Sequence, residues 1–270
     1  MLITSRDNSL LRQARAVRDG TIKELIFVEG LRLCEEALRS SLSLEAVIFS
    51  NEIARKPKVA PIIAELVKAA YRAAEVSEKL LESISFTKTP QGVVVLAQRP
   101  ESNSSLLLSN GERLPLLVVM HEINNPVNLG AIIRTAEGAG ATGAITTSNT
   151  SDPFSPKSLR GAMGSAFRLP IWHGPAFGEV IEWCDSHKIH TVCADVSSTM
   201  SFTEVDWTKP RALILGREST GLSEEEMRAA DHSARIPMQG SVESLNVAVA
   251  AGVLLYEAAR QRGKKVMSDE

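Results

Sequence analysis

The chain has 270 residues, which is enough for one large domain or two of ordinary size. Its 44% hydrophobic and 23% charged residues are typical of a globular protein, and no apolar run approaches the roughly 20 residues of a membrane span. The net charge of −2 argues against uniform, tight binding of any nucleic acid and leaves selective docking of a structured RNA open.

The cysteines and histidines point away from disulfides and metals. Cys34, Cys184 and Cys193 are odd in number and lack CxxC spacing, so we expect buried free thiols. The five histidines form no HExxH or similar ligand pattern, and we expect no metal. The N-terminus carries no apolar segment of signal-peptide length, so we expect a cytoplasmic protein.

The first hundred residues alternate short helical and strand patterns. Helices are predicted over 8–17, 31–38, 62–70 and 78–84, and strands over 46–49, 72–76 and 92–97. Within 6–23, five basic residues stand against two acidic ones, a pattern that is usually just a solvated helix face. This half is predicted to be a small α/β domain.

A polar stretch rich in proline, serine and glycine follows. It predicts a linker over 101–115, which separates a domain over 1–100 from a second domain over 116–270.

The second domain alternates more regularly. Strands are predicted over 116–120, 144–147, 191–194 and 212–215, and helices over 129–139, 156–163, 177–187 and 223–230. Such alternation predicts a mostly parallel sheet with helices on both faces. Ligands of these sheets bind outside the carboxyl ends of the strands.

Residues 138–143 match the GxGxxG pattern of dinucleotide-binding proteins. That function requires a strand before the glycines and a helix after them, because the phosphate binds at the N-terminus of the helix. Here helical spacing precedes the glycines and a predicted strand follows them. The context therefore argues against a nicotinamide-dependent dehydrogenase.

Three separated segments, 124–134, 215–222 and 236–247, each combine glycine or proline with a few polar residues. Two of them directly follow predicted strands, and the third follows the short run 234–236. In this order, they closely resemble the three motifs of the SpoU/TrmH family of RNA ribose 2′-O-methyltransferases. Residues 27–30 and 89–93 resemble the substrate-binding extension of such enzymes.

Residues of the first segment have structural explanations of their own. Asn128 stands where the helical periodicity begins, so we expect it to be an N-cap, a role compatible with a ligand contact. Arg134 falls opposite the apolar stripe, on a face that it shares with the small residues Ala131, Thr135 and Gly138. Such a face lets another segment or a ligand come close. The helix that follows Asn246 is apolar almost all round, which predicts burial in a core or a subunit interface.

The resemblance implies a catalytic domain with a deep trefoil knot, S-adenosylmethionine as the cofactor, and a homodimer. It implies catalytic roles for Arg134, Glu218, Asn128 and Asn246. We expect Arg134 to position the RNA and hold a phosphate, with the identity of the general base open. The expected cofactor-binding residues are Leu215, Gly216, Gly221, Ile236, Met238, Ser244 and Leu245, and the expected RNA contacts are Arg12, Lys157, Arg160 and Arg168.

The sequence thus predicts an S-adenosylmethionine-dependent enzyme that methylates a ribose 2′-hydroxyl in RNA. Ribosomal RNA is favoured, because the N-terminal domain resembles that of enzymes acting on ribosomal RNA. The alternatives are a tRNA methyltransferase and a non-catalytic RNA-binding protein that assists ribosome assembly. The methylated nucleotide is not predicted.

Overall fold

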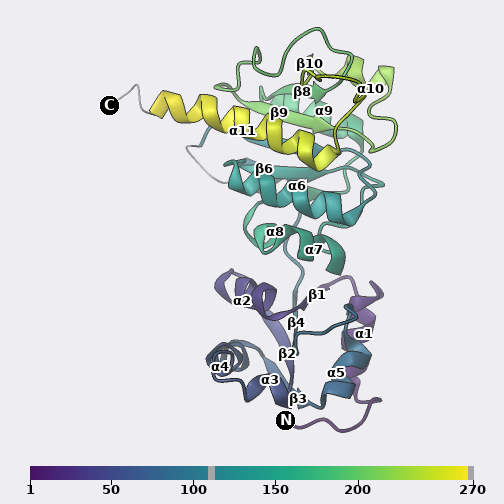
Figure 1. Cartoon of the computed structure of the whole chain (residues 1–270), viewed down its shortest axis with the longest axis vertical. Coiled ribbons are helices and arrows are strands. Elements are labelled where there is room, and N and C mark those ends of the chain that lie inside the picture. The colour runs from purple at the N-terminus through teal and green to yellow at the C-terminus, as the bar shows by residue number, and fades with distance from the viewer. Residues whose placement is uncertain (109–112, 267–270) are drawn as a thin grey trace. The chain divides into compact units, whose positions relative to one another are not determined.

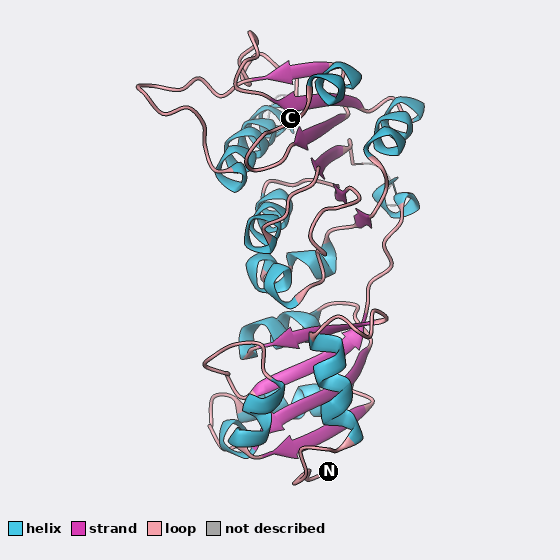
Figure 2. Cartoon of the chain, turned by 90° about the vertical axis from the view of Figure 1, so that its right-hand side faces the viewer, coloured by secondary structure: helices cyan, strands magenta, loops and turns pink. Residues whose placement is uncertain are grey.

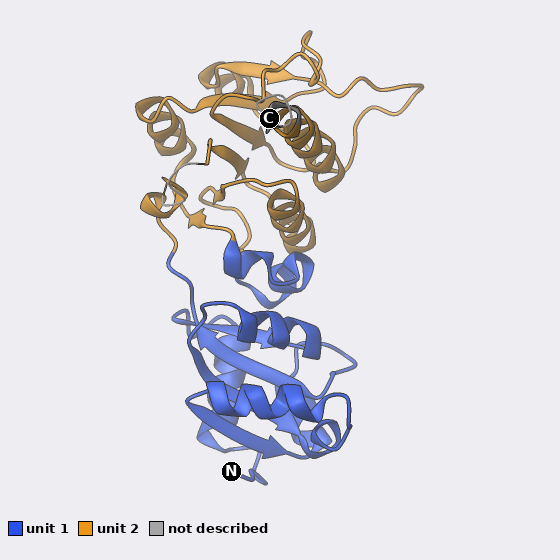
Figure 3. Cartoon of the chain, turned by 90° about the vertical axis from the view of Figure 1, so that its left-hand side faces the viewer, with its two compact units in different colours: residues 1–101, 154–168 blue, residues 102–153, 169–270 orange. Residues whose placement is uncertain are grey.

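The computed structural model describes residues 1–108 and 113–266, and of 264–266 only the backbone. The chain forms two compact units, Met1–Glu101 with Phe154–Arg168, and Ser102–Pro153 with Leu169–Glu270 (Figure 3). The predicted linker over 101–115 lies partly outside the described residues. Its described part contains a short 3-10 helix, η1 (Ser104–Leu108).

Unit 1 is built on a four-stranded mixed sheet (Figure 2). The strands are β1 (Leu25–Glu29), β2 (Leu44–Ser50), β3 (Arg72–Val76) and β4 (Val93–Gln98), in the order β1-β4-β2-β3. Strand β4 is antiparallel to both of its neighbours, and β2 and β3 are parallel. The N-terminus extends this sheet, because Leu2 bridges to Glu75 in the edge strand.

Helices cover both faces of that sheet (Figure 1). One face carries α1 (Ser9–Arg18) and α5 (Glu78–Ile84), whose leucines and isoleucine join the sheet's side chains in one apolar cluster. The other side carries α2 (Leu31–Arg39), the short α3 (Asn51–Ala54) and α4 (Ala60–Ala69). Two helices from later in the chain, α7 (Pro156–Ala162) and α8 (Ser165–Arg168), also belong to unit 1.

Unit 2 confirms the predicted parallel sheet. Its described strands are β5 (Leu116–Met120), β6 (Gly143–Thr146), β7 (Ile171–His173), β8 (His190–Ala194), β9 (Arg211–Leu215) and β10 (His232–Ala234). They run in the order β10-β8-β9-β5-β6-β7, with each pair parallel. Strands β5 and β9 at the centre are buried at every position, which explains why their sequences are apolar apart from Arg211 at the start of β9.

The helices of unit 2 lie on the two faces of this sheet. Helix α9 (Phe177–Ser186) and η1 share an apolar cluster with one face. Helices α6 (Pro126–Gly138) and α11 (Val247–Val266) pack against each other over the other face (Figure 1). A shorter helix, α10 (Glu224–Ala229), follows β9.

The start of α6 differs from the prediction. Asn128 is not the N-cap; the cap is Asn125, whose side chain accepts a hydrogen bond from the Val127 amide at 2.9 Å. Pro126 occupies the first helical turn, where its fixed φ suits the helix and its missing N–H costs nothing. Apolar periodicity begins only at Leu129, so it could not reveal this first turn. Asn128 therefore lies inside the helix with its side chain free for other contacts.

The cysteines are buried and unpaired as predicted, and burial raises the pKa of all three thiols. No cluster of potential metal ligands occurs within 1–108 and 113–266. Over the same ranges, no helix is both long and apolar enough to cross a bilayer.

Gly92 offers a test of how unit 1 packs. Its φ is +82°, and a Cβ atom there would lie 2.7 Å from Ile53 Cβ, whereas Gly20 has a φ of +76° and open space around it. We expect Gly20→Ala to cost about 1 kcal/mol of backbone strain. Gly92→Ala should cost roughly 1–3 kcal/mol more, because two structural segments must separate.

Hydrogen–deuterium exchange of β4 peptides, followed by mass spectrometry, reports on unit 1 alone. It gives the loss of unfolding free energy in each variant. Equal exchange in the two variants would contradict the steric account of Gly92.

Candidate functional site

The first two motifs lie side by side at one edge of the larger sheet. After β5 the chain crosses to β6 on one side, and after β9 it crosses to β10 on the other. This change of direction between neighbouring strands marks the place where open α/β sheets bind ligands. The His121 amide donates to the Leu215 carbonyl at 2.9 Å, so the strand pairing continues into the motifs.

The carboxylate of Glu218 connects the second motif to the first. It accepts hydrogen bonds from the backbone amides of Asn124 and Asn125 at 3.2 and 3.1 Å. It also accepts one from Asn128 Nδ2 at 3.3 Å. Because a carboxylate only accepts, the orientation of the Asn128 amide is determined, with its nitrogen toward Glu218 and its oxygen away.

Asn246 adds the third motif to this chain of contacts. Its Nδ2 donates to Asn128 Oδ1 at 3.3 Å. Its own Oδ1 accepts from the Ala248 and Val249 amides at 2.9 and 3.4 Å, so it also caps the start of α11. The side chain is exposed, although the apolar helix that follows it was predicted to be buried. The structure therefore brings three of the four predicted catalytic residues together.

The environment of Glu218 favours its charged form. Burial pushes its pKa upward, but the hydrogen bonds from Asn124, Asn125 and Asn128 outweigh this effect and leave the pKa below its ordinary value. Glu218 is thus a carboxylate at neutral pH. It holds the first motif in place and contributes negative charge to this edge of the sheet.

Glycine is required where the second motif folds back on itself. Arg217 and Gly221 exchange backbone hydrogen bonds, at 3.3 Å and 3.0 Å. A Cβ atom on Gly216 would lie 2.6 Å from the Gly221 carbonyl carbon, and Gly221 has a φ of +65°. Gly216 therefore allows the close approach of two backbone segments, and Gly221 allows the left-handed turn between them, which presents a loop of main chain beside Glu218.

Arg217 holds this loop with two carboxylates. Its Nη1 and Nη2 donate to the two oxygens of Glu226, each at 2.8 Å, and its Nε donates to Glu122 at 2.6 Å. The Arg217 guanidinium lowers the pKa of Glu226 to about 2 and that of Glu122 below its ordinary value. Both carboxylates in turn raise the pKa of Arg217. The planar guanidinium matches this forked geometry in a way that lysine cannot.

His121 is the fourth member of the cluster that Arg217, Glu226 and Glu122 form. Its ring is buried against Phe177, with centroids 4.7 Å apart, and its Nδ1 lies 2.9 Å from Thr147 Oγ1. Its Nε2 lies 2.9 Å from Glu226 and 3.1 Å from Arg217 Nη2. These contacts leave the ring no freedom to turn, so His121 supports the loop that Arg217 holds.

Arg134 stands apart from the other three predicted catalytic residues. It follows Asn128 by six residues, which is about 9 Å along the helix and about one and two-thirds turns around it. Its side chain is exposed and contacts no hydrogen-bonding or charged partner in the described part of the chain. The guanidinium is therefore available to an external anion.

The small-residue face of α6 receives another segment, as its composition predicted. That segment is α11: a Cβ atom on Gly252 would lie 3.7 Å from Thr135 Cγ2, and one on Gly138 would lie 3.4 Å from Tyr256 Oη. Arg134 shares this side of α6, so it emerges near α11. Val249 and Tyr256 on α11 remain 52% and 57% exposed within the single chain.

The predicted cofactor-binding residues lie in three stretches of unit 2. Leu215 and Gly216 end β9 and begin the loop, Ile236 and Met238 follow β10, and Ser244 and Leu245 precede α11. Along 236–245 the structure gives the backbone no hydrogen bond to other described backbone groups. Its amides and carbonyls are therefore available to a ligand.

The four predicted RNA contacts all belong to unit 1. Arg12, Lys157 and Arg160 are exposed, and no described side chain pairs with them. Arg168 instead donates to Glu36 at 2.5 Å, so part of its charge is already neutralised.

Sequence reasoning did not identify Arg217, Glu122, Glu226 and His121 as a cluster. Only Glu226 carried a local signal, since Ser223 and Glu226 have the spacing of a capping box, which the structure contains. The contacts of Arg217 with Glu122 and His121 join residues about 95 positions apart.

Comparison with known proteins supports the predicted resemblance to the SpoU/TrmH family. Residues 115–256 match the model of the SpoU rRNA Methylase family, and residues 27–102 match the model described as RNA 2′-O ribose methyltransferase substrate binding. The predicted resemblance is thereby confirmed across both units.

Individual relatives agree. The chain is 31% identical to an uncharacterized tRNA/rRNA methyltransferase of Synechocystis, over 96% of this chain and 94% of the relative. It is 35% identical to the 23S rRNA (uridine(2479)-2′-O)-methyltransferase of Streptomyces viridochromogenes, over 68% of this chain and 65%, just under two thirds, of that relative. The AdoMet-bound rRNA methyltransferase of Sinorhizobium meliloti superposes with a TM-score of 0.82 at 32% identity, covering 96% of this chain and 97% of that one.

The match of over half the chain to one family model agrees with the three connected motifs at the carboxyl ends of β5 and β9. This chain belongs to the SpoU rRNA Methylase family.

Proposed function

We propose that this chain transfers a methyl group from S-adenosylmethionine to a ribose 2′-hydroxyl in RNA, with ribosomal RNA as the substrate. The observation that carries the proposal is the hydrogen-bonded chain from Glu218 through Asn128 to Asn246, which joins the three motifs of the family into one site. The relatives named for 23S rRNA methylation and the AdoMet-bound structural neighbour support the same chemistry.

The site suits the cofactor in two respects. The free backbone of 236–245 and the loop closed by Gly216 offer main-chain donors and acceptors to an adenine ring. The carboxylates of Glu218 and Glu122 make this edge of the sheet negative, which favours a positively charged sulfonium. S-adenosylmethionine supplies the methyl group, which the ribose oxygen receives in line with the breaking carbon–sulfur bond.

Each polar residue of the site then has a defined task. Glu218 keeps the first motif against the cofactor loop, and Asn128 and Asn246 fix the start of α11 beside it. Arg134 holds an RNA phosphate, because its guanidinium is free and matches phosphate geometry. The acceptor of the hydroxyl proton is not assigned.

We also propose a homodimer, formed through the exposed apolar side chains of α11. Val249 and Tyr256 lie on this helix, and Arg134 emerges near it. Dimer formation would therefore place Arg134 at the subunit boundary. The trefoil knot in unit 2 stays a prediction from the family resemblance, and a cytoplasmic location stays a prediction from the sequence.

Unit 1 is the proposed RNA-docking part. The substrate-binding model covers most of it, and the exposed cations Arg12, Lys157 and Arg160 belong to it. We propose that residues 1–100 dock the RNA and that residues 116–270 carry out methyl transfer. Within the second range, residues 154–168 belong to the docking unit.

A methyl-transfer assay tests the function directly. Purified protein is incubated with methyl-labelled S-adenosylmethionine and total RNA from a strain that lacks the gene, so that native sites are unmodified. Label on one ribose of ribosomal RNA supports the proposal. Label on tRNA would show that tRNA, and not ribosomal RNA, is the substrate. Absence of both label and cofactor binding would favour the non-catalytic assembly protein.

A charge-swap experiment tests the contact between Asn128 and Glu218. Asn128→Asp places two carboxylates about 3.3 Å apart, and we expect at least a tenfold loss of methyl transfer, roughly 1.4 kcal/mol. Adding Glu218→Gln should restore part of it, since the new amide can donate to Asp at position 128.

Single-turnover methyl transfer of Asn128→Asp, Glu218→Gln and the double variant gives the interaction term. Additive losses would contradict the assigned contact, and Asn128→Ala separates loss of the contact from repulsion.

Arg134→Ala tests the phosphate clamp. Because Arg134 contacts no described partner, the melting temperature and the cofactor Kd should stay unchanged. Methyl transfer should fall by roughly 100-fold or more, since a positioned cation is lost from the substrate complex.

Arg228→Ala is the matched control, because it removes an exposed arginine of the same unit whose ion-pair partner among the described residues is Glu224 alone. An Arg134→Ala enzyme as active as this control would remove Arg134 from the mechanism.

A further inference from the structure

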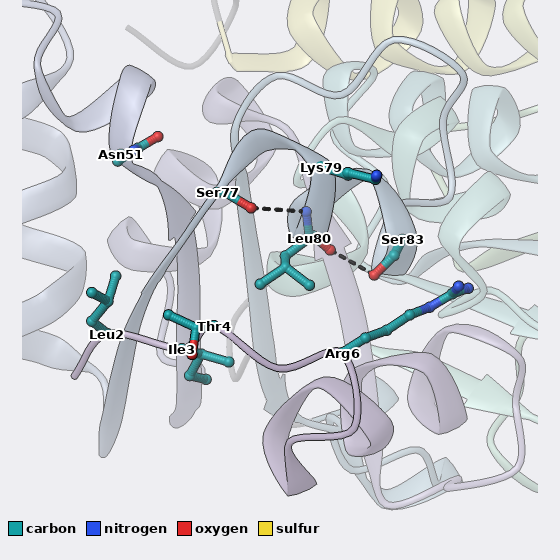
Figure 4. A pocket seen from close by; sticks show the side chains of 9 residues that line it. All are labelled: Leu2, Ile3, Thr4, Arg6, Asn51, Ser77, Lys79, Leu80 and Ser83. Carbon is teal, nitrogen blue, oxygen red and sulfur yellow. Dashed lines mark hydrogen bonds between the residues drawn. The ribbon is translucent and has the colours of Figure 1, made fainter.

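Unit 1 contains a pocket that the family motifs do not include. Its volume is about 460 Å³, and it lies between the N-terminal segment and α5 (Figure 4). We propose that this pocket binds one unpaired nucleotide of the RNA, with its phosphate on Arg6 and Lys79 and its base over Leu2 and Leu80. The proposal rests on the proposed function, because it assumes an RNA substrate.

The N-terminal residues build one wall of the pocket. The terminal ammonium of Met1 donates to the Ala73 carbonyl at 2.9 Å, and the Ile3 amide donates to the Glu75 carbonyl at 3.0 Å. This pairing to the edge of β3 points alternate side chains in opposite directions. Ile3 is thus only 3% exposed, whereas Leu2 is 69% exposed at the pocket.

The hydroxyl groups on α5 are already occupied by the helix. Ser77 Oγ accepts from the Leu80 amide at 3.4 Å, and Ser83 Oγ donates to the Leu80 carbonyl at 2.7 Å (Figure 4). They contribute polarity to the wall but have little capacity left for a ligand.

Four other polar side chains at the pocket remain available. Arg6, Lys79, Thr4 and Asn51 line it, and their side chains make no hydrogen bond or ion pair with any residue that the structure describes. Arg6 and Lys79 are exposed cations, and Asn51 can donate and accept at once. The free groups are therefore those that suit an anion and the edge of a base.

These groups match an unstacked nucleotide. Proteins that read single-stranded RNA combine cations for the backbone, a flat apolar or aromatic surface for the base, and amides for its edge. Leu2 and Leu80 supply the apolar surface, Asn51 the amide, and Arg6 and Lys79 the charge. A base-paired nucleotide could not enter, because its pairing partner covers the edge of the base and a stacked neighbour covers a face.

The positive charge around the pocket suits a longer RNA better than a free nucleotide. The guanidinium of Arg15 donates to the Arg6 carbonyl at 3.0 Å, which ties the basic helix α1 to this wall. Arg12 on the same helix is exposed and unpaired in the described structure, so positive charge continues beyond the pocket. Continued charge serves neighbouring phosphates, which only a polynucleotide possesses.

The test compares two double variants of the full chain. Arg6→Ala with Lys79→Ala removes the pocket's cations, and Lys23→Ala with Lys68→Ala removes two exposed cations of the same unit outside it. The probes are a single-stranded RNA decamer of mixed sequence and the matching duplex, titrated at several salt concentrations.

We expect the pocket variant to bind the single strand roughly tenfold more weakly than the control. The slope of log K against log salt should fall by about 0.7, since the two cations hold one phosphate and each single-strand phosphate contact contributes about 0.7. Binding of the duplex should change equally in the two variants. Equal single-strand binding by both variants would overturn the proposal.

Two further measurements separate the possible outcomes. A photo-crosslinker in place of Leu2 should attach to unpaired nucleotides of ribosomal RNA, and attachment only to paired ones would overturn the proposal. Adenosine monophosphate serves as the free-nucleotide probe, and saturation of the site by it without any effect on RNA binding would also refute an RNA site.

Cofactor binding and methyl transfer by the unaltered protein are measured on the same RNA. Loss of single-strand binding in the pocket variant supports the pocket even if no methyl transfer occurs, in which case the proposed function fails separately. Methyl transfer with equal binding by both variants leaves the function intact and removes the pocket.

Discussion

The site of this protein depends on one carboxylate that joins segments far apart in the chain. Glu218 accepts from two backbone amides and one side chain of the first motif, and Asn128 passes the contact on to Asn246. Each asparagine donates from its amide nitrogen and accepts at its amide oxygen, so each hydrogen bond determines the orientation of the next side chain. The start of α11 is capped by the last member of this series. The position of a 20-residue helix is thereby coupled to the loop that follows β9.

A second cluster keeps that loop in place. Arg217 lies between Glu226 and Glu122, and His121 supports it from the buried side. Glu122 has a φ of +52°, which a non-glycine residue adopts at a cost of about 1–3 kcal/mol when the surroundings require it. Its short bond to Arg217 is such a requirement. The loop is thus held by charge-assisted bonds on one side and by Glu218 on the other, which leaves little freedom where the cofactor would bind.

The two units divide the work by charge as well as by position in the chain. Acidic side chains gather at the motif loops of unit 2, which suits a sulfonium, while the unpaired cations assigned to RNA belong to unit 1 except for Arg134. This division reconciles a net charge of −2 with an RNA substrate, because local groups of cations attract phosphate without a basic excess over the whole chain. The pocket beside the N-terminus adds a place where an RNA could be read rather than merely attracted.

The sequence by itself determined the elements with strong periodicity and the family motifs. Strand β5, strand β3 and helix α5 agree with their predicted bounds because the spacing of apolar residues within a short segment is a local signal. Short elements such as β7, with three residues, carry too little pattern to be seen. Only the tertiary structure decided that Asn125 rather than Asn128 caps α6, that Arg134 lies away from Glu218, and that Arg217 joins Glu122 and Glu226. Contacts between residues about 90 positions apart depend on strand order, and strand order is set by the packing of the whole sheet rather than by any one segment.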